Sequence, residues 1–217
     1  MILNARDFYN IIIKIADIIA QNKDYLTQLD AAIGDADHGI NMDRGFKVAV
    51  ERLKQLNIDN ADVGTILMTV ANALLEVVGG AAGPLYGMFF MNMATIASGK
   101  KEIDLQTLTK MFEYGLKGIQ DIGGGTQPGE KTMVDTLYPF VDTLKKHADN
   151  NDNIINAFSN ALKAAESGMI STINMVAKKG RASYLGPRSV GHQDPGATSS
   201  YLMLKVFYDY IKEKGSF

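Results

Sequence analysis

Three closely spaced aspartates are the most chemically distinctive feature of the sequence. Asp30, Asp35 and Asp37 lie in the stretch LDAAIGDADHGINMDRGF, which covers residues 29–46. Carboxylate oxygens are hard ligands of the kind that hold Mg²⁺ together with water and substrate phosphates. Since Asp35 and Asp37 are two residues apart, we expect their side chains to point the same way in an extended chain. Three carboxylates could serve two such ions.

A purely structural role for these aspartates is the alternative. Asp37 could cap the following helix, and the other two could form Asx turns. However, residues 30–39 contain no lysine or arginine, so the clustered negative charge lacks a local partner unless Arg44 supplies one. A bound cation would remove the repulsion, and the sequence therefore favours a metal site.

The residues that follow the aspartates, HGINMDRGF, indicate the start of a helix. Free N–H groups at a helix N-terminus bind anions, so metal ligands and phosphate-binding amides would lie side by side. The stretch GGAAGP at 79–84 repeats this arrangement, because small residues let a backbone approach a ligand closely. Pro84 suits the first turn of a helix. Close packing between helices would explain the same small residues.

A third loop, GGGTQPGEKT at 123–132, invites comparison with a P-loop. Glu130 separates Gly129 from Lys131, and no strand precedes the loop, so we reject a P-loop fold. We retain the loop as a segment that contacts a ligand. Met133 follows it directly and could pack on a nucleotide base.

The last glycine-containing loop is basic. Its positive side chains are Lys178, Lys179, Arg181 and Arg188. Against a net charge of −2 for the whole chain, this cluster favours anion binding, although a solvated charged turn would have the same composition. Asp194 and Pro195 then indicate the start of the final helix, as its N-cap and first residue. The sequence leaves open whether His38 and His192 are phosphocarriers, general bases or hydrogen-bonding residues.

Helices must position these loops, because the apolar periodicity is helical almost throughout. Apolar residues recur at i, i+3, i+4 and i+7 in seven segments, and an apolar segment after Pro84 adds an eighth. The seven segments are 8–19, 46–53, 63–77, 105–119, 133–144, 155–169 and 201–211. Asn4 is the expected N-cap of the first helix. We find no alternating strand, repeat or low-complexity linker, and we predict a single all-α domain over residues 1–217.

The connections between the helices alternate in kind. Four are the glycine-rich loops described above, and the three between them are plain polar turns: NIDNAD, SGKKEID and ADNNDN. Short connections favour antiparallel neighbours, so every second connection falls at the same end of an up-and-down barrel or bundle. The alternation predicts one site on one rim, whereas the simpler alternative is that glycine only punctuates turns.

Composition excludes several classes of function. A net charge of −2 provides no general basic surface for nucleic acid. The absence of cysteine excludes disulfides and thiolate chemistry, and it fits a reducing cytosol. The N-terminus lacks the pattern of a signal peptide. The most apolar stretch, 79–99, is interrupted by Pro84 and Asn92 and falls short of a membrane span. We expect a cytoplasmic protein that binds neither nucleic acid nor membrane.

Four motifs together resemble those of a known family. GDADHGINMDRGF, GGAAGPLYG, GEKTMVDTL and GRASYLGPRSVGHQDPGATSS occur in this order over nearly the whole chain, and they closely resemble the nucleotide-binding L subunits (DhaL) of bacterial dihydroxyacetone kinases. The resemblance implies a barrel of eight antiparallel helices with a nucleotide at one rim. It also implies that Asp30, Asp35 and Asp37 are ligands of two Mg²⁺ ions that bridge the phosphates.

The resemblance further implies a set of residues that contact ADP or ATP. They are His38, Gly39, Ile40, Asn41, Ala81, Ala82, Gly124, Met133, Arg181, Asp194, Pro195 and Gly196. Of these, Gly124 and Met133 would line the base or the ribose. The sequence departs from the family at two positions. Ala82 stands where serine is frequent, which removes a hydroxyl donor, and Pro187 replaces a common glutamate.

Family members of this stand-alone type use bound ADP like a coenzyme. A phosphohistidine carrier subunit (DhaM-like) rephosphorylates it, and the resulting ATP donates to dihydroxyacetone on a separate subunit (DhaK-like). The resemblance implies that the histidines here are not phosphocarriers and that no catalytic side chain is needed beyond the metal and nucleotide site. Two alternatives stay open: a kinase subunit that uses free ATP on dihydroxyacetone or another short sugar, and a nucleotide-loaded regulator of a transcription factor.

Overall fold

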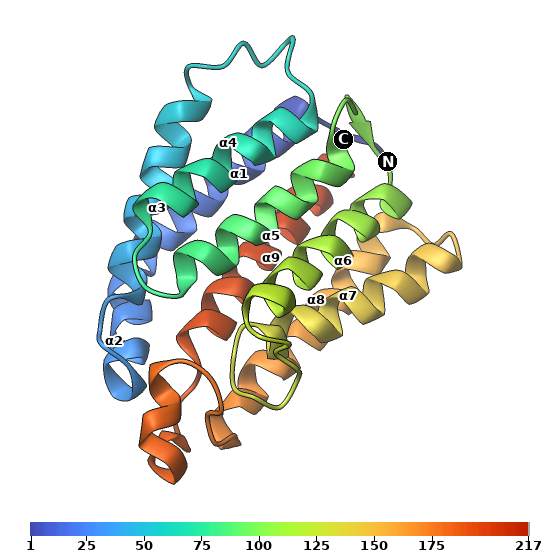
Figure 1. Cartoon of the computed structure of the whole chain (residues 1–217). Helices are drawn as coiled ribbons and strands as arrows, with labels where there is room; N and C mark the ends of the chain where they lie inside the picture. The colour runs from blue at the N-terminus through green and yellow to red at the C-terminus, as the bar shows by residue number, and fades with distance from the viewer. Residues whose placement is uncertain (217) are drawn as a thin grey trace.

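The computed structural model describes residues 1–216, most of which are helical (Figure 1). The described α-helices are α1 (Ala5–Gln21), α2 (Lys23–Ile33), α3 (His38–Leu53), α4 (Val63–Val77), α5 (Ala82–Ala97), α6 (Leu105–Ile122), α7 (Val134–Asp149), α8 (Ile154–Ser171) and α9 (Pro195–Lys214). Two 3₁₀ segments, η1 (Thr172–Asn174) and η2 (Arg181–Ser189), lie between α8 and α9. The strands β1 (Leu3–Asn4) and β2 (Glu102–Ile103) form a short antiparallel pair.

Eight of the described helices form a closed ring. From α3 to α9, each helix packs against the next one in chain order, and α1 closes the ring by packing against both α3 and α9. Neighbouring helices in the ring run antiparallel (Figure 1), as short connections favour; the longer connection between α8 and α9 contains η1 and η2. The predicted all-α barrel of eight up-and-down helices is confirmed.

The ninth helix, α2, lies outside this ring and packs against α3. The sequence prediction contained no separate helix here. The chain leaves α1 at Asn22, whose side-chain amide donates to the Ile18 carbonyl oxygen at 2.8 Å. Asn22 is the C-cap of α1, with a non-helical φ of −103° and ψ of 10°, and α2 begins at the next residue. As a result, Asp30 lies in the last turn of a separate short helix.

Phenylalanines from several helices fill the interior of the barrel. The ring of Phe112 on α6 packs at centroid distances of 5.1 Å from Phe140, 5.2 Å from Phe207 and 6.0 Å from Phe158. These edge-to-face contacts are favourable for aromatic pairs. The middle of the barrel is therefore a packed core.

Helix caps confirm two predictions. Asn4 caps α1 in a reciprocal capping box with Asp7, and the Asp194 carboxylate caps α9 by accepting from the Ala197 amide at 2.7 Å, with Pro195 as the first helical residue. Each cap satisfies amides that a helix start leaves free.

Among the described helices, none has the length and apolarity of a membrane span.

Candidate functional site

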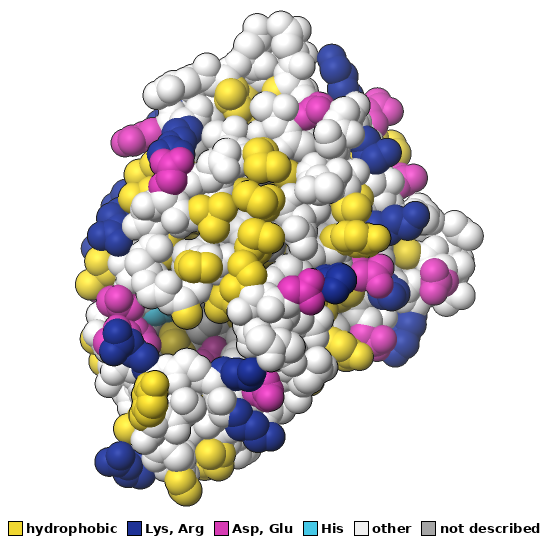
Figure 2. All heavy atoms as spheres, in the orientation of Figure 1, with side chains coloured by type: hydrophobic (Ala, Val, Ile, Leu, Met, Phe, Trp, Pro, Cys, Tyr) yellow, Lys and Arg dark blue, Asp and Glu magenta, His cyan; other side chains and the backbone are white. Residues whose placement is uncertain are grey.

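A cavity of about 490 Å³ opens at one end of the barrel, within the size range of small-molecule sites. Figure 2 shows the hollow between the body of the barrel and the projecting segment that contains η2. The lining residues come from all four glycine-rich loops, in the ranges 30–41, 79–85, 119–134, 179–182 and 194–196. The prediction that these loops share one rim is confirmed.

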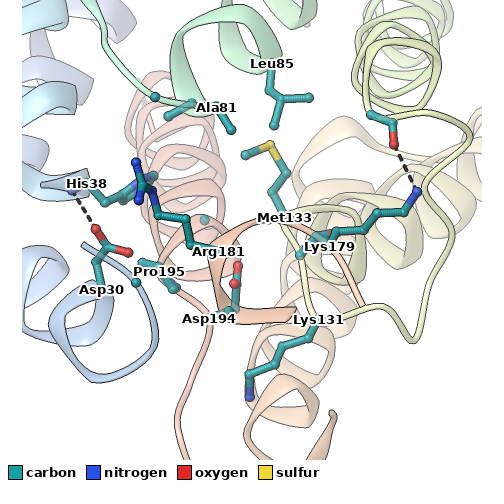
Figure 3. Close-up of a pocket in the computed structure, with 18 of the residues that line it drawn as sticks. Asp30, His38, Ala81, Leu85, Lys131, Met133, Lys179, Arg181, Asp194 and Pro195 are labelled. Atoms are coloured by element: carbon teal, nitrogen blue, oxygen red, sulfur yellow. Dashed lines mark hydrogen bonds between the residues drawn. The ribbon is translucent and has the colours of Figure 1, made fainter. Parts of the chain in front are cut away.

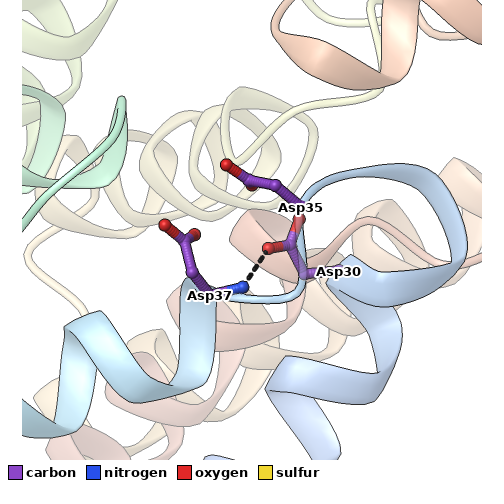
Figure 4. Close-up of side chains that lie close together, drawn as sticks. All are labelled: Asp30, Asp35 and Asp37. Atoms are coloured by element: carbon purple, nitrogen blue, oxygen red, sulfur yellow. Dashed lines mark hydrogen bonds between the residues drawn. The ribbon is translucent and has the colours of Figure 1, made fainter.

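The three aspartates converge at the edge of this cavity (Figure 4). One carboxylate oxygen from each of Asp30, Asp35 and Asp37 lies within 4.8 Å of the others. The expected extended backbone is wrong, because Ala36 between two of them has a φ of 61°. This left-handed conformation is uncommon for a residue other than glycine. A sharp turn, rather than an extended segment, brings the carboxylates together.

Asp30 supports the start of α3, whereas Asp37 does not cap it. The Asp30 carboxylate is buried and accepts from the backbone amides of Asp37 at 2.9 Å and His38 at 3.1 Å. Asp37 occupies the N-cap position, but its own side chain makes no capping hydrogen bond. The capping alternative for Asp37 is therefore not realised, and its carboxylate is available to a ligand.

The charges of the cluster are poorly balanced by its surroundings. Burial raises the pKa of Asp37, an Asn41 hydrogen bond partly opposes this, and the nearby Asp35 and Asp30 charges raise it further. Arg181 Nε lies 2.8 Å from the Asp35 carboxylate, but both side chains are exposed, and such surface pairs stabilise by less than about 1 kcal/mol. Three oxygen donors with excess negative charge suit a divalent cation such as Mg²⁺.

The start of α5 forms a second wall of the cavity. Gly80 has a φ of 67°, which glycine adopts without strain. Ala81 is the N-cap and offers no side-chain acceptor, so the first amides of α5 depend on other partners. Gly83 is needed for packing, since a Cβ there would lie 2.2 Å from the Val78 carbonyl oxygen. The small residues of this loop thus serve both a close helix contact and an open helix N-terminus.

A third wall is apolar. Met133 and Leu85 approach one another across the cavity in Figure 3, and both line it together with Ile119, Ile122 and Val134. Flat apolar ligands such as a nucleotide base suit such a wall. Sequence reasoning identified only Met133, because the other side chains continue the core stripes of α5, α6 and α7. Ile122 lies at the end of a helix, directly before a run of glycines, and this position was the one feature of the sequence that could have indicated an apolar wall.

Only part of the basic cluster reaches the cavity. Lys179 and Arg181 line it, whereas Lys178 and Arg188 do not. Lys179 Nζ donates to the Gly123 and Gly124 carbonyl oxygens at 3.2 and 3.3 Å, as Figure 3 shows in part. Lys179 therefore connects the third glycine-rich loop to the fourth by hydrogen bonds. Among the described contacts, Arg181 is the one member of the basic cluster that forms an ion pair with the three aspartates.

Lys131 has a structural role that the sequence did not suggest. Its side chain is only 1% exposed, and its Nζ donates to the carbonyl oxygens of Thr172 and His192 at 2.5 Å each. Burial lowers the pKa of Lys131, while Asp194 and Asp135 oppose that shift. Because the amine is held by backbone, this lysine does not act as a P-loop lysine would, in agreement with the rejected P-loop fold.

His38 is a buried hydrogen-bonding residue. Its Nε2 lies 2.8 Å from the Ser199 hydroxyl, and burial lowers the pKa of His38 to about 4. The imidazole is therefore neutral at physiological pH. His192 does not line the cavity.

The structure brings most of the predicted nucleotide contacts together. His38, Asn41, Ala81, Ala82, Met133, Arg181, Asp194, Pro195 and Gly196 line the cavity with the three aspartates, and Gly39, Ile40 and Gly124 do not. At Gly39, a Cβ would lie 1.9 Å from the Lys23 carbonyl oxygen, so this glycine is required where α3 crosses α2. Ile40 is 50% exposed on the outer side of α3.

Comparisons with known proteins give a consistent result. Residues 32–209 match the family model of the DAK2 domain. The chain is 43% identical to the ADP-binding subunit DhaL of the PEP-dependent dihydroxyacetone kinase of Escherichia coli (strain K12), over 98% of this chain and 100% of that protein. It is 38% identical to the corresponding DhaL of kinase 2 of Listeria innocua, over 98% of each chain.

Solved structures share the fold. The chain superposes on the dihydroxyacetone kinase of C. freundii in complex with AMP-PNP and Mg²⁺ with a TM-score of 0.70 and 23% identity. The match covers 93% of this chain and 33% of that kinase. The chain thus spans about a third of the length of that structure, and the likeness to it concerns the helical barrel.

Proposed function

The chain belongs to the DAK2 domain family, and from this premise we propose that it is the ADP-binding subunit of a PEP-dependent dihydroxyacetone kinase, acting in the cytoplasm. One observation carries the proposal. A carboxylate cluster and the N-termini of α3, α5 and α9 face an apolar wall across a single cavity. Metal ligands, phosphate-binding amides and a base-binding surface are the three parts that a metal–nucleotide site requires.

The cavity suggests how ADP would lie. The base would pack between Leu85 and Met133, and the phosphates would face the first turns of α3, α5 and α9. Asp30, Asp35 and Asp37 would hold two Mg²⁺ ions, which when bound neutralise phosphate charge and fix the reacting oxygens. Arg181, at the exposed edge, would stabilise the charge of the transferred group.

The side chains present favour transfer between bound nucleotide and separate partners. Phosphoryl transfer needs positioning and charge neutralisation more than a covalent residue. His38 is buried, neutral and bonded to Ser199, so it is poorly suited to accept a phosphoryl group. We therefore propose that a DhaM-like phosphohistidine carrier rephosphorylates the ADP. The ATP so formed would donate to dihydroxyacetone on a DhaK-like subunit.

Native mass spectrometry of the purified protein tests this function. We expect a mass that exceeds that of the chain by one ADP and two Mg²⁺ ions, and we expect the ADP to persist through buffer exchange. The retained ADP should become ATP when a phosphorylated carrier subunit is added. A protein that binds no adenine nucleotide in the presence of Mg²⁺ would contradict the proposal.

Use of free ATP is a second candidate function. The C. freundii kinase structure contains AMP-PNP and Mg²⁺, which favours direct binding of a nucleoside triphosphate within this fold. Isotope-labelled ATP separates the two functions. Rapid exchange of bound ADP for free ATP, with sugar phosphorylation in the absence of a carrier, would support the second candidate. A pull-down with a transcription regulator in place of a kinase subunit would instead indicate a regulatory role.

A further inference from the structure

Tyr86 on α5 is fully buried, and its hydroxyl is the centre of a polar network inside the barrel. This hydroxyl lies 3.0 Å from the Gly196 carbonyl oxygen and 2.7 Å from the hydroxyls of both Ser199 and Ser200. Ser199 in turn lies 2.8 Å from His38 Nε2. In one proton arrangement the imidazole donates to Ser199, both serines donate to the phenol, and the phenol donates to the Gly196 carbonyl. The Ser199 hydroxyl also lies 3.2 Å from the Gly196 carbonyl oxygen, which is a more distant second acceptor for its single proton.

The network joins three helices that are not consecutive in the ring. Tyr86 belongs to α5, whose neighbours are α4 and α6, whereas Ser199 and Ser200 belong to α9, whose ring neighbours are α8 and α1. His38 is the first residue of α3. The hydrogen bonds therefore cross the interior of the barrel. They connect helices that the loops do not connect directly.

Each of these three helices presents its N-terminus to the cavity. Asp37 and His38 line it at the start of α3, Ala82 at the start of α5, and Pro195 and Gly196 at the start of α9. The positive ends of helix dipoles repel one another, so their convergence needs rigid support. Tyr86, Ser199 and Ser200 lie behind the cavity wall and do not line it. They can act on a ligand only through the helix starts that they hold.

We propose that Tyr86 is a positioning residue for the phosphate groups of the bound nucleotide. Its hydroxyl fixes the starts of α3 and α9 relative to α5, so that the groups which these helix starts present to the cavity meet the phosphates together. The proposal rests on the nucleotide-binding function proposed above. The base would contact Leu85, Ile122 and Met133, whose side chains are apolar and take no part in the network. We therefore expect the effect of Tyr86 to fall on phosphate recognition.

Substitution Tyr86→Phe tests the proposal, because it removes the hydroxyl and keeps the buried ring. Titration calorimetry with ADP plus Mg²⁺, and separately with adenosine, compares ligands with and without phosphates. We expect ADP to bind about tenfold more weakly, the effect of roughly one buried hydrogen bond, and adenosine to bind unchanged. Tyr114→Phe is the matched control, since Tyr114 on α6 is 47% exposed; both affinities should stay at the wild-type value.

Three outcomes separate the hypotheses. Unchanged ADP affinity in Tyr86→Phe, or an equal loss for ADP and adenosine, would overturn the positioning role. Failure of the wild-type protein to bind ADP would overturn the proposed function instead. If Tyr86→Phe does not fold, Ser199→Ala provides the same test, because it breaks the link between His38 and Tyr86 with a smaller change in side-chain volume.

Discussion

At the scale of single residues, the three aspartates of the cavity carry the same side chain in different surroundings. Asp30 is 8% exposed and accepts two backbone amides. Asp35 has a guanidinium partner in Arg181. Asp37 makes no capping bond, and burial together with its two acidic neighbours raises its pKa. The charge of Asp37 is therefore a cost to the ligand-free fold that a bound cation would remove.

Substitution Asp37→Asn should stabilise the ligand-free protein. The substitution removes one of three mutually repelling charges and no hydrogen bond of the helix cap, so the free energy of unfolding in EDTA should rise by up to about 1 kcal/mol. The additional stabilisation that ADP plus Mg²⁺ confers on the wild type should be lost. Urea denaturation in EDTA, and then with both ligands, measures the two effects.

Asp30→Asn is the matched comparison for this prediction. Asp30 uses its charge to hold the Asp37 and His38 amides, so its neutralisation should lower the free energy of unfolding by about 2 kcal/mol even in EDTA. Equal effects of the two substitutions in EDTA would show that the aspartates do not differ in the way the structure indicates.

Asp194, a residue that lines the cavity, makes the stability of the folded protein depend on pH. Burial raises the pKa of Asp194 to about 7, the Ala197 amide and Lys131 oppose this, and Asp135 and Asp30 add to it. In the unfolded chain the pKa is about 3.9, so between these values the folded state holds a proton that the unfolded state releases. The contribution of Asp194 to stability therefore falls as pH rises from about 4 to about 7.

An asparagine in place of Asp194 can still cap α9 but cannot titrate. As pH rises from 5 to 8, the free energy of unfolding of the wild type should fall relative to that of Asp194→Asn by about 1 kcal/mol or more. Urea denaturation in EDTA at both pH values measures this shift. A difference that is the same at the two pH values would refute the assignment.

At the scale of elements, the apolar stripes predicted seven of the eight helices of the ring, because each buries one face against the same core, and the apolar segment after Pro84 predicted the eighth, α5. They failed at α2, where the turn at Asn22 and packing against α3 decide the structure. They also failed at η2, since Gly180 and Gly186 have positive φ values that no periodic pattern encodes. The periodic pattern of apolar residues thus predicts helices that bury one apolar face in the core. It does not predict elements that depend on a backbone turn or on packing against one other helix.

The crossing of α2 and α3 provides a test at this scale. Glycine inside a helix normally costs about 1 kcal/mol relative to alanine, but a Cβ at Gly39 would meet the Lys23 carbonyl oxygen. We expect Gly39→Ala to lower the free energy of unfolding by about 1–3 kcal/mol because the two helices must move apart. Ile40→Ala, at the exposed neighbouring position, should change it by less than about 0.5 kcal/mol.

Chemical denaturation of the two ligand-free variants decides the point. If the Gly39→Ala protein were as stable as the wild type, α2 would not be packed against α3 as closely as the structure shows at Lys23 and Gly39. Glycine at position 39 would then have to be explained by ligand contact, as the family resemblance implied.

At the scale of the whole molecule, the alternation of loops was enough to predict that one rim holds the site. It could not predict the apolar wall, because Leu85 and Ile119 belong to ordinary core stripes. Nor could it predict that Lys131, which lines the cavity, uses its Nζ to bind the Thr172 and His192 carbonyl oxygens. These features depend on pairs of residues distant in sequence, and a local pattern does not contain them.

The single rim makes a prediction for hydrogen exchange of the intact chain. Ligand binding slows exchange in every segment whose opening would break the site. Addition of ADP and Mg²⁺ should therefore protect residues 34–41, 79–85, 123–132 and 179–194 together, although they are far apart in sequence. The polar turns at 54–62, 98–104 and 150–153, at the other end of the barrel, should exchange as in the ligand-free protein. Protection limited to the aspartate segment would mean that the metal cluster alone binds the ligand and that the other three loops only connect helices.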